Sequence, residues 1–339
     1  MAAEPSAKAR AWVIFDRIVA RAAPGGVHTN PWVRSSDGHP RFEPDFDTLV
    51  QLLGVPLHLK AGTQSGVPAL ALDVWLSYEL RRAGFNTDQA WPRPVHPRIL
   101  PAPIANLLKA LPSGIRKTVS DRIEKDGAIT GATSSSGIIL GKNYLKQVDV
   151  VISDWVTGPE LLISTKRMDS SYGKNAPNRI EESYGDAKNL RLRHPLAALG
   201  FVFGLRSDIL QKEPATAEWL FDLLGKLGRE DDAYHATCLV LMEYSNEGVI
   251  PDTGEEPPVT ALPEPGQELE DEDVPAPAPD SVVDRDIAQL PKVKILKEEI
   301  PEELAPGRFL AAMVTRVLGA TPVNMHKEAR KRRASPELQ

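Results

Sequence analysis

The chain has 339 residues, of which 42% are hydrophobic and 25% charged, and its formal net charge is −6. This composition is typical of a globular protein, and the length suits one large domain or two domains. The single cysteine, Cys238, excludes a disulfide framework and a cysteine-rich zinc site, and it is interpreted as a core residue because it begins an apolar run. We expect a cytoplasmic protein, because we find no signal-peptide pattern and no apolar stretch long enough to span a membrane.

The negative net charge comes from one segment. Residues 251–280 contain ten acidic residues and no basic residue, so the remainder of the chain carries a charge of +4. A mildly basic body is compatible with a phosphate-bearing partner, although it does not require one.

The N-terminal part of the chain predicts helices separated by loops. Apolar residues at helical spacing indicate helices over residues 7–23, about 46–53, 66–85 and 104–125. Residues 27–45 are rich in Pro, Gly, Ser and Asp and are expected to form a loop.

The central part predicts strands alternating with helices. The strands are expected at residues 137–140, 148–152, 161–165, 197–205 and 237–244, and the helices at 178–192 and about 215–228. This order indicates an α/β fold with a mixed central β-sheet flanked by helices.

Four regions follow from these patterns. They are an N-terminal helical region (1–60), a core (61–250), a disordered acidic Pro-rich linker (251–290) and a small C-terminal helical module (291–339). The module ends in the basic segment 327–333, which predicts either a solvated, disordered end or a non-specific phosphate contact.

Two charged side chains fall within the apolar strands of the predicted hairpin. Because side chains alternate between the faces of a strand, Asp149 points away from its apolar neighbours. On the return strand, Ser164 and Lys166 share one face. A lone charge in an apolar strand is costly unless it is paired or binds a metal. An acid and a lysine that converge here indicate a site for phosphodiester hydrolysis, for which carboxylates bind Mg²⁺ and lysine stabilises charge.

This pattern resembles the PD-(D/E)XK restriction-endonuclease-like superfamily. Its core has an acid on one strand and an acid-x-lysine on the next, to which Asp149 and Ser164-Thr165-Lys166 correspond here. Serine stands where the second acid is expected. The chain therefore looks like the subgroup in which that acid has migrated to the following helix and leaves Ser-x-Lys on the strand. The resemblance covers about residues 66–245.

The next helix offers two candidates for the migrated acid. Ile180, Tyr184, Ala187 and Leu190 define its predicted apolar face, which Glu181 flanks and from which Glu182 points away. We therefore expect Glu181 to complete the metal site with Asp149, and Glu182 is the alternative.

The resemblance also implies an acid on an earlier helix and a segment that contacts DNA. The matching acid is Asp73, with Glu79 as the alternative. The polar loop between Lys166 and the next helix contains residue types that contact phosphates and base edges. The predicted DNA-binding residues are Arg167, Ser170, Ser171, Lys174, Asn175, Asn178, Arg179 and, further on, Arg191.

The resemblance implies a Mg²⁺-dependent DNA endonuclease, similar to type II restriction or phage-defence nucleases. Double-stranded DNA is the expected partner, and a homodimer or higher homo-oligomer and a cognate methyltransferase or defence-system partner are further expectations. The alternative is an inactive protein on a nuclease fold that binds DNA or docks a partner, which gains if neither glutamate reaches the Asp149–Lys166 site. A nuclease that cuts RNA is a third, weaker option.

Overall fold

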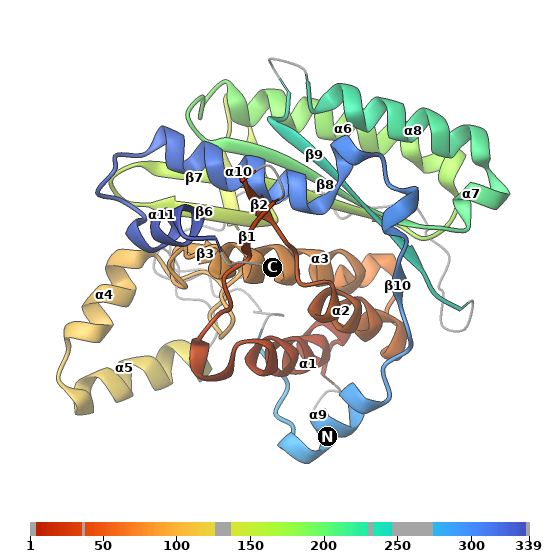
Figure 1. Ribbon diagram of the computed structural model, residues 1–339. Helices are drawn as coiled ribbons and strands as arrows, with labels where there is room; N and C mark the ends of the chain where they lie inside the picture. The colour runs from red at the N-terminus through yellow and green to blue at the C-terminus, as the bar shows by residue number, and fades with distance from the viewer. Residues whose placement is uncertain (1–4, 36–37, 126–136, 230–232, 246–273, 337–339) are drawn as a thin grey trace.

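The computed structural model describes residues 5–35, 38–125, 137–229, 233–245 and 274–336. The protein has an α/β fold in which a curled, mixed, six-stranded sheet is flanked by helices (Figure 1). The predicted fold class is confirmed at this level. Within the described residues, no helix is both long enough and apolar enough to cross a membrane.

The sheet has the strand order β10-β9-β8-β7-β6-β3. The strands are β3 (Ala90–Trp91), β6 (Val150–Asp154), β7 (Gly158–Met168), β8 (Ala198–Arg206), β9 (Ala236–Glu243) and β10 (Lys294–Ile295). The central strands β7, β8 and β9 are parallel, whereas β6 forms an antiparallel hairpin with β7. The parallel strands require crossovers, which are provided by α6 (Tyr172–Arg191) and α8 (Pro214–Leu227).

Helices cover both faces of the sheet. Figure 1 shows α6 and α8 side by side on one face, with α3 (Val67–Arg82) on the other. Helix α10 (Pro306–Ala320) packs against β8 and β9. Gly200 in β8 permits this contact, because a Cβ atom there would lie 2.7 Å from the Phe309 ring of α10.

Helices α1 (Ala7–Ala22) and α2 (Phe46–His58) pack against α3 and against one another. The single helix expected at 104–125 is instead two helices, α4 (Ala102–Ala110) and α5 (Ser113–Lys125), which extend from the body in Figure 1. They break at Leu111, which is extended because it precedes Pro112, and a residue before proline disfavours helical backbone.

Three smaller differences from the prediction have local causes. The expected loop 27–45 contains the hairpin of β1 (Trp32–Arg34) and β2 (Pro40–Phe42), which buries Trp32 edge-on against Phe42. The predicted strand 148–152 divides at Asp149 into β5 (Leu145–Val148) and β6, and β5 pairs with β4 (Gly137–Leu140). The remaining short helices are α7 (Ile209–Lys212) and the 3₁₀ turns η1 (Pro24–Gly26), η2 (Thr63–Ser65), η3 (Lys297–Glu299) and η4 (Glu302–Leu304).

Helix α6 begins six residues earlier than the predicted start at residue 178 and includes Pro177. An internal proline costs a helix about 3 kcal/mol. The burial of Tyr172 and Ala176 in the core offsets this cost. The sequence pattern alone does not reveal this burial.

The C-terminal region is joined to the core rather than separate from it. Strand β10 pairs with β9 and extends the sheet, so the expected boundary at 291 is not a structural one. The predicted linker 251–290 is interrupted by α9 (Asp280–Ala288), where Asp284 accepts a 2.8 Å hydrogen bond from Arg17 of α1. Residues 251–273 of that linker lie outside the described residues.

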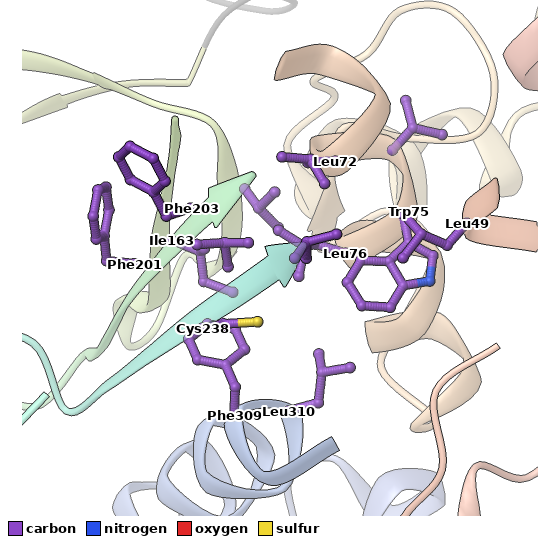
Figure 2. Packing of buried hydrophobic residues seen from close by; sticks show 14 of the residues in the cluster. Leu49, Leu72, Trp75, Leu76, Ile163, Phe201, Phe203, Cys238, Phe309 and Leu310 are labelled. Atoms are coloured by element: carbon purple, nitrogen blue, oxygen red, sulfur yellow. The ribbon is translucent and has the colours of Figure 1, made fainter. Parts of the chain in front are cut away.

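The core fills the space between the sheet and its helices. Figure 2 shows Cys238 facing the layer that contains Leu76 of α3 and Phe309 and Leu310 of α10. Burial raises the pKa of the Cys238 thiol, so this residue is an inert core side chain, as predicted.

The basic segment 327–333 forms most of α11 (Lys327–Ala334) and is not a disordered tail. Its arginines donate hydrogen bonds to backbone carbonyls: Arg332 to Arg82 O at 2.7 Å and Arg330 to Leu318 O at 2.7 Å. These two side chains therefore fasten α11 to the end of α3 and to α10.

We expect the change Gly84→Ala to destabilise the protein by about 2–5 kcal/mol. Gly84 has φ of 102°, and an added Cβ would lie 2.7–2.9 Å from the backbone of Glu328 and Ala329 in α11. Strained backbone contributes about 1–2 kcal/mol and the clash about 1–3 kcal/mol. Gly25→Ala is the matched control, because its φ is 63° and nothing lies within 4 Å of the added Cβ. Equal losses in urea unfolding of the two variants would refute the close contact.

Candidate active site

A cavity of about 340 Å³ lies where α3, the bend between β5 and β6, strand β7 and helix α6 meet. It brings together residues far apart in sequence. Four of the predicted catalytic residues line it, namely Asp73, Asp149, Ser164 and Lys166.

Two carboxylates are held by one residue of β7. Asp149 Oδ2 accepts a 2.7 Å hydrogen bond from the backbone N–H of Thr165, and Asp73 Oδ1 accepts a 2.5 Å hydrogen bond from the Thr165 hydroxyl. The predicted alternation of the strand is confirmed, since Thr165 faces α3 and Lys166 faces α6. The alternative acid, Glu79, lies elsewhere and pairs with Arg82 at 2.7 Å.

The charged form of Asp73 is disfavoured in this site. Its side chain is buried, and burial together with the negative charge of Asp149 raises its pKa well above the ordinary value. The hydrogen bond from Thr165 and the positive charge of Lys8 oppose this rise without cancelling it. Two adjacent carboxylates of this kind favour a proton or a cation between them.

Lys166 is paired with Glu182, the alternative candidate for the migrated acid. Its Nζ lies 3.4 Å from Glu182 Oε1. Burial alone would raise the pKa of Glu182, but the charges of Lys166 and Lys146 hold it below the usual value. Glu181 and Glu182 are both exposed, and neither is among the residues that line the cavity. The helix acid that contacts Lys166 is therefore Glu182 and not Glu181, which the sequence favoured.

The error arose from one aromatic residue. The predicted apolar face included Tyr184, which is 37% exposed, whereas Ser183 is 1% exposed and lies at the cavity. Because Ser183 and not Tyr184 belongs to the buried face of α6, that face lies closer to Glu182 than the sequence predicts. A polar serine gives no hydrophobic signal, so periodicity could not have found this orientation.

The sequence analysis missed a second pair of charges. Lys146 of β5 lies 2.5 Å from Asp186 and 3.5 Å from Glu182, one turn apart on α6. The charge of Asp186 raises the pKa of Lys146 although its burial opposes this. The spacing of four residues between the two acids was the available signal. Lys8 of α1 also lines the cavity, and no pattern in the sequence indicated it.

The β4–β5 hairpin that carries Lys146 is fixed to α6 by Asn189. The Asn189 Oδ1 accepts a hydrogen bond from Asn143 N at 2.9 Å, and its Nδ2 donates to Tyr144 O at 3.0 Å. The Tyr144 hydroxyl donates to Asp186 at 3.2 Å. These contacts place the lysine at the cavity without relying on the charge pair alone.

Ser164 lies beside Lys166 on the face toward α6. Its side chain is buried and hydrogen-bonded to the Tyr234 hydroxyl, which donates to Ser183 O at 2.8 Å. Ser164 therefore supports the wall of the cavity and supplies no carboxylate, as the sequence indicates.

The predicted DNA-binding residues differ in their exposure. Arg167, Asn175 and Arg179 are buried, and Arg167 pairs with Asp169 at 2.9 Å while it also lines the cavity. Ser170 is half-buried at the end of β7. Those that are exposed on or beside the first turns of α6 are Ser171, Lys174 and Asn178. Because residues 172–179 are helical, the expected polar loop is reduced to residues 169–171.

Arg191 lies at the other end of α6, away from the cavity lining. It donates a 3.1 Å hydrogen bond to Ala233 O, and its charge acts on Arg316 of α10. Its predicted role beside the other DNA-binding residues is not supported by this position.

The donor set is modest for a metal site. Within the described residues, no group of three or more His, Cys, Asp or Glu side chains is arranged to hold a metal ion. Mg²⁺ commonly takes one or two protein carboxylates and completes its shell with water or substrate phosphate. The Asp73–Asp149 pair fits that requirement, because its mutual repulsion is what a bound cation relieves.

Comparison of the chain with models of protein families, with curated proteins and with solved structures finds no match.

Proposed function

We propose that this chain is a phosphodiester hydrolase on a PD-(D/E)XK-like core. More specifically, we propose a Mg²⁺-dependent DNA endonuclease of the type II-like restriction or phage-defence kind, acting on double-stranded DNA as a homodimer or higher homo-oligomer. The observation that carries the proposal is the convergence of Asp73, Asp149 and Lys166 on one cavity at the β6–β7 hairpin, where Glu182 of α6 pairs with Lys166.

Each residue has a role that its position supports. Asp73 and Asp149 would hold Mg²⁺, which when bound neutralises charge on the phosphate and activates water. Lys166 presents an ammonium group to the cavity and stabilises negative charge that develops on the phosphate. Glu182 holds that ammonium group in place from α6.

Exposed polar residues at the start of α6 suit a DNA backbone. Lys174 and Asn178 lie on the outer side of the first turns of α6, and Ser171 begins that helix. Such side chains contact phosphate oxygens and position a duplex. Lys8 and Lys146 add positive charge inside the cavity.

The test is cleavage of a randomised duplex DNA library by the purified protein, followed by sequencing of the ends. We expect cutting with Mg²⁺ and none with EDTA. Absence of cutting across the library at any Mg²⁺ concentration would reject the endonuclease.

One observation favours the alternative of a binding protein without activity. Ser164 supplies no acid on the strand, and Glu182 is paired with two lysines rather than with Asp149. Under this alternative, duplex DNA binds with equal affinity with and without Mg²⁺ and is not cut.

The two neighbouring glutamates of α6 form a matched pair of variants. We expect Glu182→Gln to reduce DNA cleavage about 10²-fold, because Lys166 loses the carboxylate that orients it. Glu181→Gln changes the same functional group one residue away on an exposed position and is expected to leave cleavage within about twofold. The measurement is the single-turnover rate with excess enzyme. A larger loss in Glu181→Gln would restore Glu181 as the migrated acid.

A further inference from the structure

A second hollow lies on α10, apart from the residues that line the catalytic cavity. It is an open groove of about 780 Å³ between the outer face of α10 and His235, just before β9. Ala312 and Gly319 form part of its floor, so a ligand can approach the helix surface closely.

The charged residues of this groove have one sign. Arg308 and Arg316 line it, and none of its lining residues is a carboxylate. Arg308 is 3.9 Å from Glu302, at the limit of an ion pair. Burial and the charge of Arg191, at the end of α6, lower the pKa of Arg316. Two elements, α10 and the end of α6, therefore bring positive charge close together, and an anion would relieve the repulsion between these arginines.

His235 adds a donor with a fixed direction. Its Nδ1 accepts a 2.9 Å hydrogen bond from Leu199 N, which assigns the proton of the neutral ring to Nε2. Among the described residues, Nε2 has no hydrogen-bond partner. Burial, followed by the charges of Arg316 and Arg191, lowers the pKa of His235 to about 4, so the ring is neutral at pH 7. A buried N–H group without an acceptor is unfavourable, and an anionic oxygen would satisfy it.

We propose that the groove between α10 and His235 binds a phosphate group, with Arg316 as the charged contact, Arg191 as a further positive charge from α6 and His235 Nε2 as a neutral donor. Arginine suits this task because its planar group pairs with two phosphate oxygens. The exposed hydroxyl of Thr315 lies on the same face and offers one more donor. The phosphate belongs either to a small phosphorylated compound or to a nucleic-acid strand that runs beyond the catalytic cavity.

The test measures binding in EDTA, so that it does not depend on DNA cleavage. The probes are pyrophosphate and a short fluorescent duplex DNA, titrated into the full-length protein at low salt. Arg316 is exposed, and the variant Arg316→Gln removes its positive charge. The double variant Arg316→Gln with Arg191→Gln removes the positive charges of both arginines. The control, Arg285→Gln, alters an exposed arginine on α9, which Figure 1 places at the opposite end of the molecule.

We expect the affinity for at least one probe to fall about tenfold in Arg316→Gln and further in the double variant, with no change in the control. Loss of affinity for both probes identifies a site for free phosphate compounds, and loss for duplex DNA alone identifies a contact to the nucleic-acid backbone. Unchanged affinity for both probes in Arg316→Gln, with the fold intact by circular dichroism, overturns the proposal. If the protein cuts DNA but Arg316→Gln leaves the affinity for both probes unchanged, the phosphate site in the groove is rejected and the proposed nuclease activity is retained.

Discussion

Lys166→Ala should abolish Mg²⁺-dependent DNA cleavage, with a loss of at least about 10³-fold in the single-turnover rate. The Lys166 side chain is 10% exposed and pairs with Glu182, so its ammonium group has a fixed position in the cavity that Asp73 and Asp149 also line. Removing one preorganised group that stabilises transition-state charge costs about 10²–10³-fold. A lysine that also orients the attacking water adds a further factor.

The protein should stay folded in this variant. Glu182 keeps a second cation, because Lys146 lies 3.5 Å away, so the change does not leave this carboxylate without a positive partner. Lys226→Ala is the matched control: Lys226 pairs with Asp222 at 2.5 Å, but both side chains are more than half exposed on α8. Cleavage retained by Lys166→Ala, at a rate near that of Lys226→Ala, would remove Lys166 from the mechanism.

The sequence was most informative where chemistry and hydrophobic periodicity coincide. Asp149 and Lys166 could be predicted because a charge in an apolar strand is unusual, and alternation then assigns it to a face. Asp73 followed only from the resemblance to a nuclease family. The central strands and α3 were predicted close to their observed bounds, since they bury continuous apolar runs.

The sequence was least informative where tertiary contacts override local preference. Helix α6 runs through Pro177 because Tyr172 and Ala176 are buried, and nothing local to Pro177 indicates this. Lys8 and Lys146 reach the cavity from elements whose position depends on packing across long sequence separations. The same holds for the groove at Arg316, where α10 meets His235, which precedes β9, and where Arg191 of α6 adds its charge.

Asp73→Asn should stabilise the protein in EDTA while it removes DNA cleavage. The raised pKa of Asp73 means that the folded state binds its proton more tightly than the unfolded state does. Its stability contribution is fully present below the ordinary pKa of 3.8 and is lost as pH rises through the raised value. At neutral pH the buried charge of Asp73 therefore opposes folding. Asparagine accepts the same Thr165 hydrogen bond without a charge.

The expected gain is about 1–3 kcal/mol at about pH 8, shrinking toward about pH 4, in thermal or urea unfolding of wild type and variant. Asp222→Asn, at an exposed position on α8, should show no such pH-dependent gain. Mg²⁺ should stabilise the wild type and not Asp73→Asn, because binding to the folded state adds stability only where the carboxylate pair is complete. If Asp73→Asn is less stable than wild type at pH 8 in EDTA, the acid pair is not under electrostatic strain. The argument that it is arranged for a cation would then fail.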